Sequence, residues 1–147
     1  EEMVDDFSLN AVGALSAVKA ARNALVSGKG SVLLFSTVAV GQGFANHASI
    51  AMAKGAVEGL TRSLAADLTP HVRVNAIAPS LTLGGMGDRI AVSDKMRDAI
   101  AGAHPLKRLG AGTDMAAIGL ALLAPDGWIT GQIINVDGGR GALRGGD

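Results

Sequence analysis

Apolar residues recur at three- and four-residue steps in three long stretches of the chain, covering residues 5–26, 48–68 and 113–123. That spacing places the apolar side chains on one face of a helix. Pro70 ends the second stretch, because proline cannot continue a helix. The sequence therefore predicts three main helices, and a shorter one near residues 93–101. The predicted apolar face of the first helix carries Leu9, Val12, Leu15, Val18 and Leu25, and Arg22 falls at the same spacing.

Three short apolar runs alternate with these helices, at residues 31–36, 72–78 and 129–136. They are continuous rather than alternating, which is typical of strands buried on both faces of a parallel sheet. Glycine-containing loops are expected at residues 37–47 and 80–87. Strands that alternate with helices are joined by right-handed crossovers. The predicted fold class is α/β, a three-layer, doubly wound parallel sheet of the Rossmann type.

The composition narrows the range of functions. Lysine plus arginine and aspartate plus glutamate both number 13, so no net charge attracts nucleic acid or an anionic membrane surface. Cysteine is absent, which excludes disulfides and thiolate chemistry. No apolar run approaches the roughly 20 residues that a membrane-spanning helix needs. We expect a soluble, cytoplasmic protein that binds neither nucleic acid nor membrane and has no metal site, and the start at Glu1 favours a partial chain.

Five motifs in one order carry a resemblance to a known family. They are NAVG at residues 10–13, FST at 35–37, AKGAVEGLTRSLA at 53–65, RVNAIAP at 73–79 and ITGQIINVDGG at 129–139. Each is short, but together they span essentially the whole chain. On these motifs the sequence resembles the short-chain dehydrogenase/reductase family, whose members transfer a hydride between a nicotinamide cofactor and a carbonyl or alcohol carbon.

The resemblance implies that residues 1–147 are the C-terminal half of an NAD(P)-binding Rossmann domain. The family sheet has seven strands, of which this chain supplies the last three, and the glycine-rich turn that holds the cofactor pyrophosphate is not found. The residue that distinguishes NAD from NADP belongs to the other half, so the cofactor is expected to be either one. A half sheet leaves a strand edge unpaired, and the isolated chain is expected to be poorly stable.

The family's catalytic residues can be carried over position by position. Lys54 matches the lysine that binds the cofactor ribose and lowers the pKa of a tyrosine hydroxyl. Ile50 occupies the position of that tyrosine, and the chain contains no tyrosine at all. Asn10 matches the asparagine that holds a proton-relay water. The family's serine falls on Thr37, with Ser36 as the alternative if the loop differs by one residue.

The loop after residue 78 matches the part of the family that meets the nicotinamide. Pro79 and Ser80 stand at its proline-glycine corner, and backbone groups of Leu81 and Thr82 are expected to contact the carboxamide. The glycine of the corner is replaced here by Ser80. His47 lies three residues before the tyrosine position and is either a substitute proton donor or a capping histidine. The other two histidines, His71 and His104, are assigned no chemistry.

Three functions fit the sequence. The first is an NAD(P)-dependent oxidoreductase that acts on a small carbonyl or alcohol substrate with an atypical proton donor. The second is a non-catalytic subunit that binds a dinucleotide or serves in assembly, and the third is an inactive truncated fragment. The helices at residues 5–26 and 48–68 correspond to those that pair between subunits in the family, so a homodimer or homotetramer is expected.

Overall fold

The computed structural model describes residues 1–144 and contains a three-stranded parallel sheet. The strands are β1 (Ser31–Phe35), β2 (Arg73–Pro79) and β3 (Ile133–Val136), and β2 lies in the centre. Ser31 pairs with Arg73 at the start of the sheet. Five consecutive residues of β2 are fully buried, as the continuous apolar run predicted. The parallel α/β prediction is confirmed.

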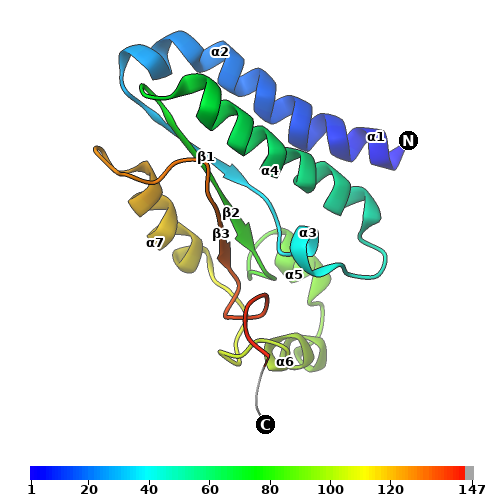
Figure 1. The fold of residues 1–147 in the computed structure, drawn as a ribbon. Helices are drawn as coiled ribbons and strands as arrows, with labels where there is room; N and C mark the ends of the chain where they lie inside the picture. Colours follow the sequence, from blue (N-terminus) through cyan, green and yellow to red (C-terminus); the bar gives the residue numbers. More distant parts are fainter. Residues whose placement is uncertain (145–147) are drawn as a thin grey trace.

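Helices cover both faces of the sheet (Figure 1). On one face α4 (Ala48–Leu68) packs against β2, with a continuous helical rod made of α1 (Glu2–Phe7), η1 (Ser8–Val12) and α2 (Gly13–Ser27) beside it. On the other face α7 (Gly112–Leu123) packs against β1 and β2. The long helix predicted at residues 48–68 has those bounds. The apolar core lies between α4, the rod and the sheet.

The first helix differs from the prediction in which residues face the core. Its middle turn, η1, is a π-helix, which inserts one residue into the helical repeat and rotates the residues on either side. Ala11 and Val18 are buried as a result, whereas Leu9 is 79% exposed and Val12 is 47% exposed. The predicted apolar face is therefore wrong at Leu9 and Val12, because a regular spacing was assumed across the turn.

The last strand begins later than the predicted residue 129. Gly131 has a φ of +71°, which interrupts extended backbone. Beside it, the backbone N–H of Val74 donates to the hydroxyl of Thr130 rather than to a backbone carbonyl, at 3.1 Å. Residues 129–132 therefore run alongside β2 without regular strand geometry, and β3 starts only at Ile133.

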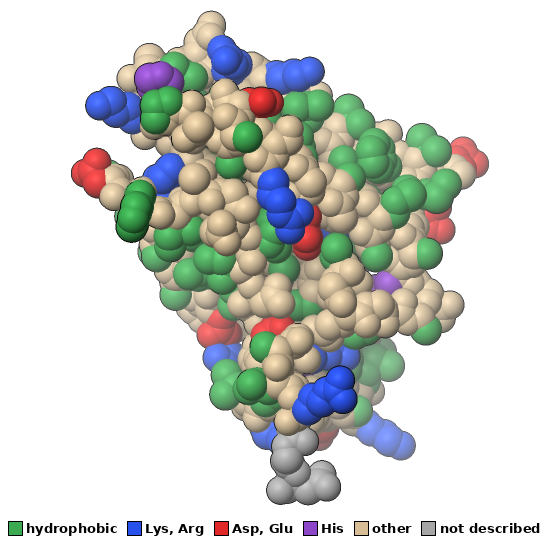
Figure 2. Space-filling model, in the orientation of Figure 1, with side chains coloured by type: hydrophobic (Ala, Val, Ile, Leu, Met, Phe, Trp, Pro, Cys, Tyr) green, Lys and Arg blue, Asp and Glu red, His purple; other side chains and the backbone are tan. Residues whose placement is uncertain are grey.

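Both predicted loops contain short helices, α3 (Ala39–Gln42) and α5 (Met86–Ile90). The short helix expected near residues 93–101 is α6 (Asp94–Gly102), and the hydroxyl of Ser93 accepts the N–H of Met96 at its start. Each outer strand, β1 and β3, pairs only with β2 within the described residues. Figure 2 shows hydrophobic side chains exposed over α1 and α4, at the right of the view.

Candidate active site

Lys54 lies over the end of β1. Its ammonium Nζ donates to the backbone carbonyl of Phe35 at 2.9 Å, one residue before Ser36. Burial lowers the pKa of Lys54 from its ordinary value, because the charged form loses hydration. The helix α4 thus brings Lys54 to the carboxyl end of a parallel strand, where ligands of open α/β sheets bind.

The two hydroxyl residues that the sequence left as alternatives have different surroundings. Ser36 is buried, and its hydroxyl donates to Glu58 Oε1 at 2.8 Å. Thr37 is half-buried, and its Oγ1 accepts only a long bond of 3.3 Å from the N–H of Ala39. Thr37 also lines a cavity of about 230 Å³ between α3, α4 and β3. The hydroxyl with capacity to bind a ligand is therefore that of Thr37.

Asn10 lies in the π-helical turn η1, beside the first turn of α4. Its side-chain amide donates to the carbonyl of Asp6 at 2.9 Å. The carboxylate of Asp6 accepts the hydroxyl of Ser49 at 2.7 Å, and Ser49 directly precedes Ile50. Asp6 thereby ties the turn that carries Asn10 to the turn that carries Ile50. Irregular π-helical turns of this kind are frequent at functional sites.

No proton-carrying side chain replaces tyrosine at Ile50 itself, which is half-buried one helical turn before Lys54. His47 is exposed at the start of α4, and its Nδ1 lies 2.7 Å from the carbonyl of Ala45. Its ring packs edge-to-face with the ring of Phe44. The guanidinium of Arg140 lies over the same Phe44 ring, 4.7 Å from the ring centroid. His47 stands at the N-cap position of α4, but its side chain makes no capping hydrogen bond there.

The Pro79–Thr82 segment follows β2 at the same end of the sheet. The carbonyl of Pro79 accepts the N–H of Val38 at 3.2 Å, and that of Leu81 accepts the N–H of Gly110 at 3.0 Å. The hydroxyl of Thr82 donates to the carbonyl of Ser80 at 3.0 Å. Three of the carbonyls in this predicted cofactor segment therefore already have protein partners.

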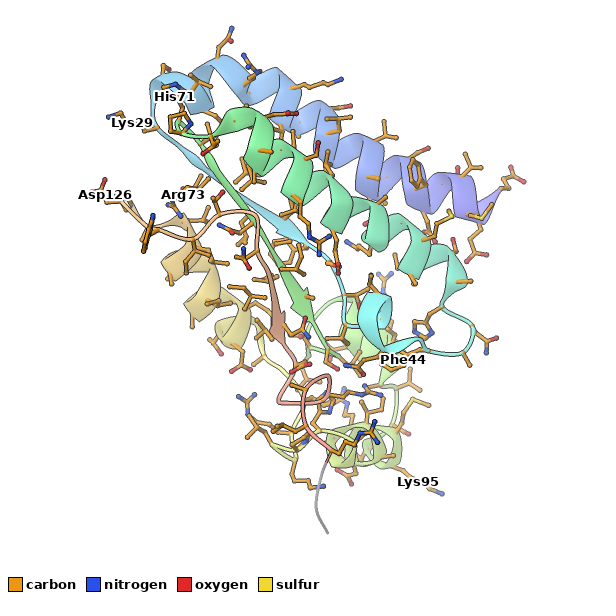
Figure 3. All side chains as sticks on the ribbon, viewed as in Figure 1. Lys29, Phe44, His71, Arg73, Lys95 and Asp126 are labelled. Carbon is orange, nitrogen blue, oxygen red and sulfur yellow. The ribbon has the colours of Figure 1, made fainter. Side chains whose placement is uncertain are left out.

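Ser80 is linked to a buried histidine. The hydroxyl Oγ of Ser80 lies 2.8 Å from Nε2 of His104, which is 2% exposed, and 3.4 Å from Nη1 of Arg140. Ser80 and His104 border a cavity of about 480 Å³ that is also lined by Leu81, Arg108 and Asp114. Its volume falls in the range of small-molecule sites. Figure 3 shows the carboxyl end of the sheet in the lower half of the view, at the opposite end from the labelled His71 and Arg73.

An ion pair closes one wall of that cavity. The guanidinium of Arg108 donates to both carboxylate oxygens of Asp114, at 2.7 and 2.8 Å. This hydrogen bond, together with one from the backbone N–H of Ala111, lowers the pKa of Asp114 to about 2. Asp114 is the third residue of α7, and its carboxylate accepts the N–H of Ala111, the residue at the N-cap.

Three site residues were not found from the sequence: Glu58, His104 and Arg140. Glu58 follows Lys54 by four residues, so the helical spacing could have placed it on the same face. His104 and Arg140 lie 24 and 60 residues from Ser80, and no local pattern connects positions so far apart.

Comparisons with known proteins identify the family of this chain. The sequence model of the family described as Enoyl-(Acyl carrier protein) reductase matches residues 1–140. An uncharacterized oxidoreductase of Mycobacterium tuberculosis (strain CDC 1551 / Oshkosh) is 38% identical over 143 residues, which is 95% of this chain and 54% of that protein. The chain belongs to the short-chain dehydrogenase/reductase family, as the motifs indicated.

Solved structures of the same fold extend the likeness. A short-chain type dehydrogenase/reductase from Mycobacterium ulcerans superposes with a TM-score of 0.85 at 33% identity, covering 96% of this chain and 52% of that one. The structure of ElxO with NADP bound superposes with a TM-score of 0.81 at 27% identity, covering 89% and 54%. The chain thus spans about half the length of the relatives it matches.

Two further observations concern metals and membranes. Among the residues whose placement is described, no group of three or more histidine, aspartate or glutamate side chains is arranged to hold a metal ion. None of the described helices combines the length and the apolar character that crossing a bilayer requires.

Proposed function

We propose that the protein is an NAD(P)-dependent oxidoreductase that transfers a hydride to or from a carbonyl or alcohol substrate. The observation that carries the proposal is Lys54, whose ammonium is bonded to the carbonyl before Ser36 and Thr37 at the carboxyl end of β1. Asn10 lies beside the first turn of the same helix, to which the hydrogen bond between Asp6 and Ser49 connects its segment. Lys54 and Thr37 are the residues we assign to the ribose and to the substrate oxygen.

The residues present fit the nicotinamide end of such a cofactor. A partly buried ammonium at Lys54 suits a ribose hydroxyl, and the cavity beside Ser80 and Leu81 is large enough for a small ring. When bound, the nicotinamide supplies or accepts the hydride. ElxO, which is similar in fold, has NADP bound in its structure. The cofactor that we propose for this chain is NAD or NADP. We assign the cofactor-binding role to Lys54, Pro79, Ser80, Leu81 and Thr82.

Two observations support the prediction that residues 1–147 form the C-terminal half of a larger Rossmann domain. The outer edge of β1 has no strand partner within the described residues, and the ring of Phe35 on that strand is 49% exposed. The relatives are about twice as long as the matched segment. We expect a separately made N-terminal half to raise the melting temperature of this chain, and an unchanged value would contradict the prediction.

A second function is favoured by Ile50, which cannot transfer a proton at the expected tyrosine position. In that case the protein binds the dinucleotide or assembles with other subunits without catalysis. The exposed apolar side chains on the rod, Met3, Val4, Phe7, Leu9 and Val12, suit the expected homodimer or homotetramer. We place the protein in the cytoplasm. An inactive fragment is the third candidate.

The test is cofactor binding followed by turnover, with the protein as its gene encodes it. NADH and NADPH are titrated and followed by calorimetry and by the fluorescence of the reduced nicotinamide, because Trp128 is fully exposed and its indole reports poorly on the site. Reduction of ethyl acetoacetate and of tetralone is then measured. Binding with turnover supports the oxidoreductase, binding without turnover supports the second function, and no binding at millimolar cofactor contradicts both.

A further inference from the structure

We propose that Ser80 and His104 together exchange the proton that tyrosine exchanges elsewhere, with Arg140 assisting. The proposal rests on the oxidoreductase function proposed above. It concerns a hydroxyl and a buried imidazole that were assigned no catalytic role from the sequence.

The hydrogen bonds of His104 define which nitrogen carries its proton. Nδ1 lies 2.8 Å from the carbonyl of Ile100, and a carbonyl oxygen can only accept. Nδ1 therefore carries the hydrogen, and in the neutral ring Nε2 is left as an acceptor. The hydroxyl of Ser80, 2.8 Å away, donates to that Nε2. A hydroxyl that donates to an imidazole, which is itself oriented by a further group, is the arrangement that activates serine for proton transfer.

Arg140 and the cavity complete the unit. Nη1 of Arg140 lies 3.4 Å from the same Ser80 Oγ, so its positive charge stabilises the oxygen as its proton leaves. Stacking over Phe44 holds the guanidinium in place. Ser80 is half-buried, and with His104 it borders the cavity of about 480 Å³ at the carboxyl ends of β2 and β3. The N–H of Val38 donates to the carbonyl of Pro79 at 3.2 Å, so Ser80 follows a residue bonded to the segment that carries Thr37, which is assigned to the substrate oxygen.

Two other polar side chains, those of Ser36 and His47, are less suited to the task. The Ser36 hydroxyl is bonded to Glu58 in a buried setting. His47 is exposed, and its described hydrogen bond is to the carbonyl of Ala45. Within residues 1–144, the contact between Ser80 and His104 is the serine–histidine hydrogen bond that the structure provides.

The proton and electron movements balance in the direction of alcohol oxidation. The substrate O–H proton passes to Ser80 Oγ as the proton of Ser80 passes to Nε2 of His104. The two electrons leave the alcohol carbon as a hydride, for which the oxidised nicotinamide is the acceptor. The products are a carbonyl and a protonated His104, which returns its proton to water in the cavity. Reduction runs through the same steps in reverse.

The first experiment compares turnover of ethyl acetoacetate and tetralone in matched variants. Ser80→Ala is expected to lower kcat by about a hundredfold or more. Ser80→Thr keeps the hydroxyl and is expected to retain turnover within about tenfold. His104→Gln keeps a hydrogen bond to Ser80 but cannot carry the proton, so it is expected to lose kcat as Ser80→Ala does. If His104 only supported the fold, His104→Gln would lose little kcat.

Controls use residues of the same type outside the site. Ser63→Ala changes an exposed serine of α4, and His71→Gln changes an exposed histidine at the other end of the sheet. Both are expected to match the unmodified protein, and melting temperatures show that every variant is folded. Turnover of Ser80→Ala within about threefold of the parent would overturn the proposal. So would cofactor binding without reduction of either probe, which leaves the binding function standing.

A second readout needs neither cofactor nor substrate. Nitrogen NMR of labelled histidine in the free protein is expected to show His104 with Nδ1 protonated and Nε2 as acceptor, and the Nε2 signal is expected to move in Ser80→Ala. An unmoved signal would overturn the pairing even if no cofactor binds.

A further variant adds a proton donor at another position. Ile50→Tyr in the Ser80→Ala background places a hydroxyl one turn from Lys54 and is expected to restore at least about tenfold of the lost kcat.

Discussion

The two ends of the parallel sheet use polar side chains differently. Where the strands begin, the guanidinium of Arg73 donates to the carbonyls of Leu122 and Ala124 and to the hydroxyl of Ser31, and the buried amide of Asn75 bonds to the loop before β3. Figure 3 shows Arg73 at this end, with Lys29, His71 and Asp126 nearby.

Where the strands stop, polar groups border cavities instead. Thr37 and Asn135 line the smaller cavity, and Ser80 and Asn135 line the larger one. A polar group whose partners are all internal holds elements together, whereas one that faces a cavity retains hydrogen-bonding capacity for a ligand. Structural and functional roles are therefore separated along the strand direction, and four predictions test this separation.

The largest effect is expected at Arg73. Arg73→Ala leaves the carbonyls at the end of α7 and in the following loop without their donor, and we expect the free energy of unfolding to fall by about 3 kcal/mol. Urea denaturation measures it. Cofactor affinity per folded molecule is expected to stay the same, since the site lies at the opposite end.

Arg73→Lys and Arg22→Ala are the companions of that variant. Lysine cannot reproduce the forked guanidinium, so it is expected to recover less than half of the loss. Arg22 is exposed on α2 and its removal is expected to change little. A stable Arg73→Ala protein with lost cofactor binding would break the separation of the two ends.

Lys54→Met is expected to produce the next largest effect, on binding rather than stability. It removes a charged donor at the carboxyl end of β1, and the cofactor Kd is expected to rise by about tenfold to a hundredfold, as for a charge-assisted hydrogen bond. Calorimetric titration with NADH and NADPH measures it. Lys19→Met, an exposed lysine on α2, is the control. Equal affinities of the two variants would remove Lys54 from the site.

The pair Ser36→Ala and Thr37→Val sharpens the comparison within two adjacent residues. Ser36→Ala deletes a buried hydrogen bond to Glu58 and is expected to destabilise the fold by about 1 kcal/mol with unchanged kcat per folded molecule. Thr37→Val keeps the shape of a side chain that faces the cavity and is expected to reduce turnover by roughly tenfold with little loss of stability.

Thermal melting and steady-state kinetics on the same preparations separate the two outcomes. If Ser36→Ala lowers turnover and Thr37→Val lowers stability, then the roles assigned to the two hydroxyls are reversed, and the one-residue loop difference considered from the sequence is correct.

The smallest effect concerns Asp114 and pH. The hydrogen bond from Arg108, with that from the N–H of Ala111, holds the pKa of this carboxyl at about 2, below the value of about 4 in an unfolded chain. The folded state therefore gains stability that is present above about pH 4 and is lost as the pH falls through about 2. Melting temperatures of Asp114→Asn are expected to lack this part of the acid dependence.

Parallel melting curves of both proteins between about pH 2 and pH 6 provide the measurement. Asp98→Asn, an exposed carboxylate on α6, is the matched control and is expected to follow the parent. Identical acid curves for Asp114→Asn and the parent would show that the ion pair beside the cavity adds no stability.

Much of the fold could be predicted from spacing alone. Helix α4 has the predicted bounds, because an uninterrupted apolar period ends at a proline and local preference agrees with packing. The rod at residues 2–27 was predicted as a helix but its buried face was not, because the π-turn at Ser8–Val12 changes which residues turn inward. The late start of β3 depends on Thr130, whose side chain takes the place of a backbone partner across the sheet.

The candidate site was predicted only in part, because spacing along the chain identifies local motifs but not partners that are distant in sequence. Lys54 and Asn10 were proposed because they belong to short motifs whose order survives in the sequence. The partners of Ser80 are 24 and 60 residues away, and only folding brings them within hydrogen-bonding distance.

The sequence by itself determined the family, the parallel α/β order of elements and the absence of tyrosine at position 50, because these follow from residue types and short-range spacing. The tertiary structure alone decided that Ser36 is bonded to Glu58 while Thr37 faces a cavity, and that His104 meets Ser80. Side-chain partners are decided by packing between elements distant in sequence, and spacing along the chain does not encode which hydroxyl is left with capacity for a ligand.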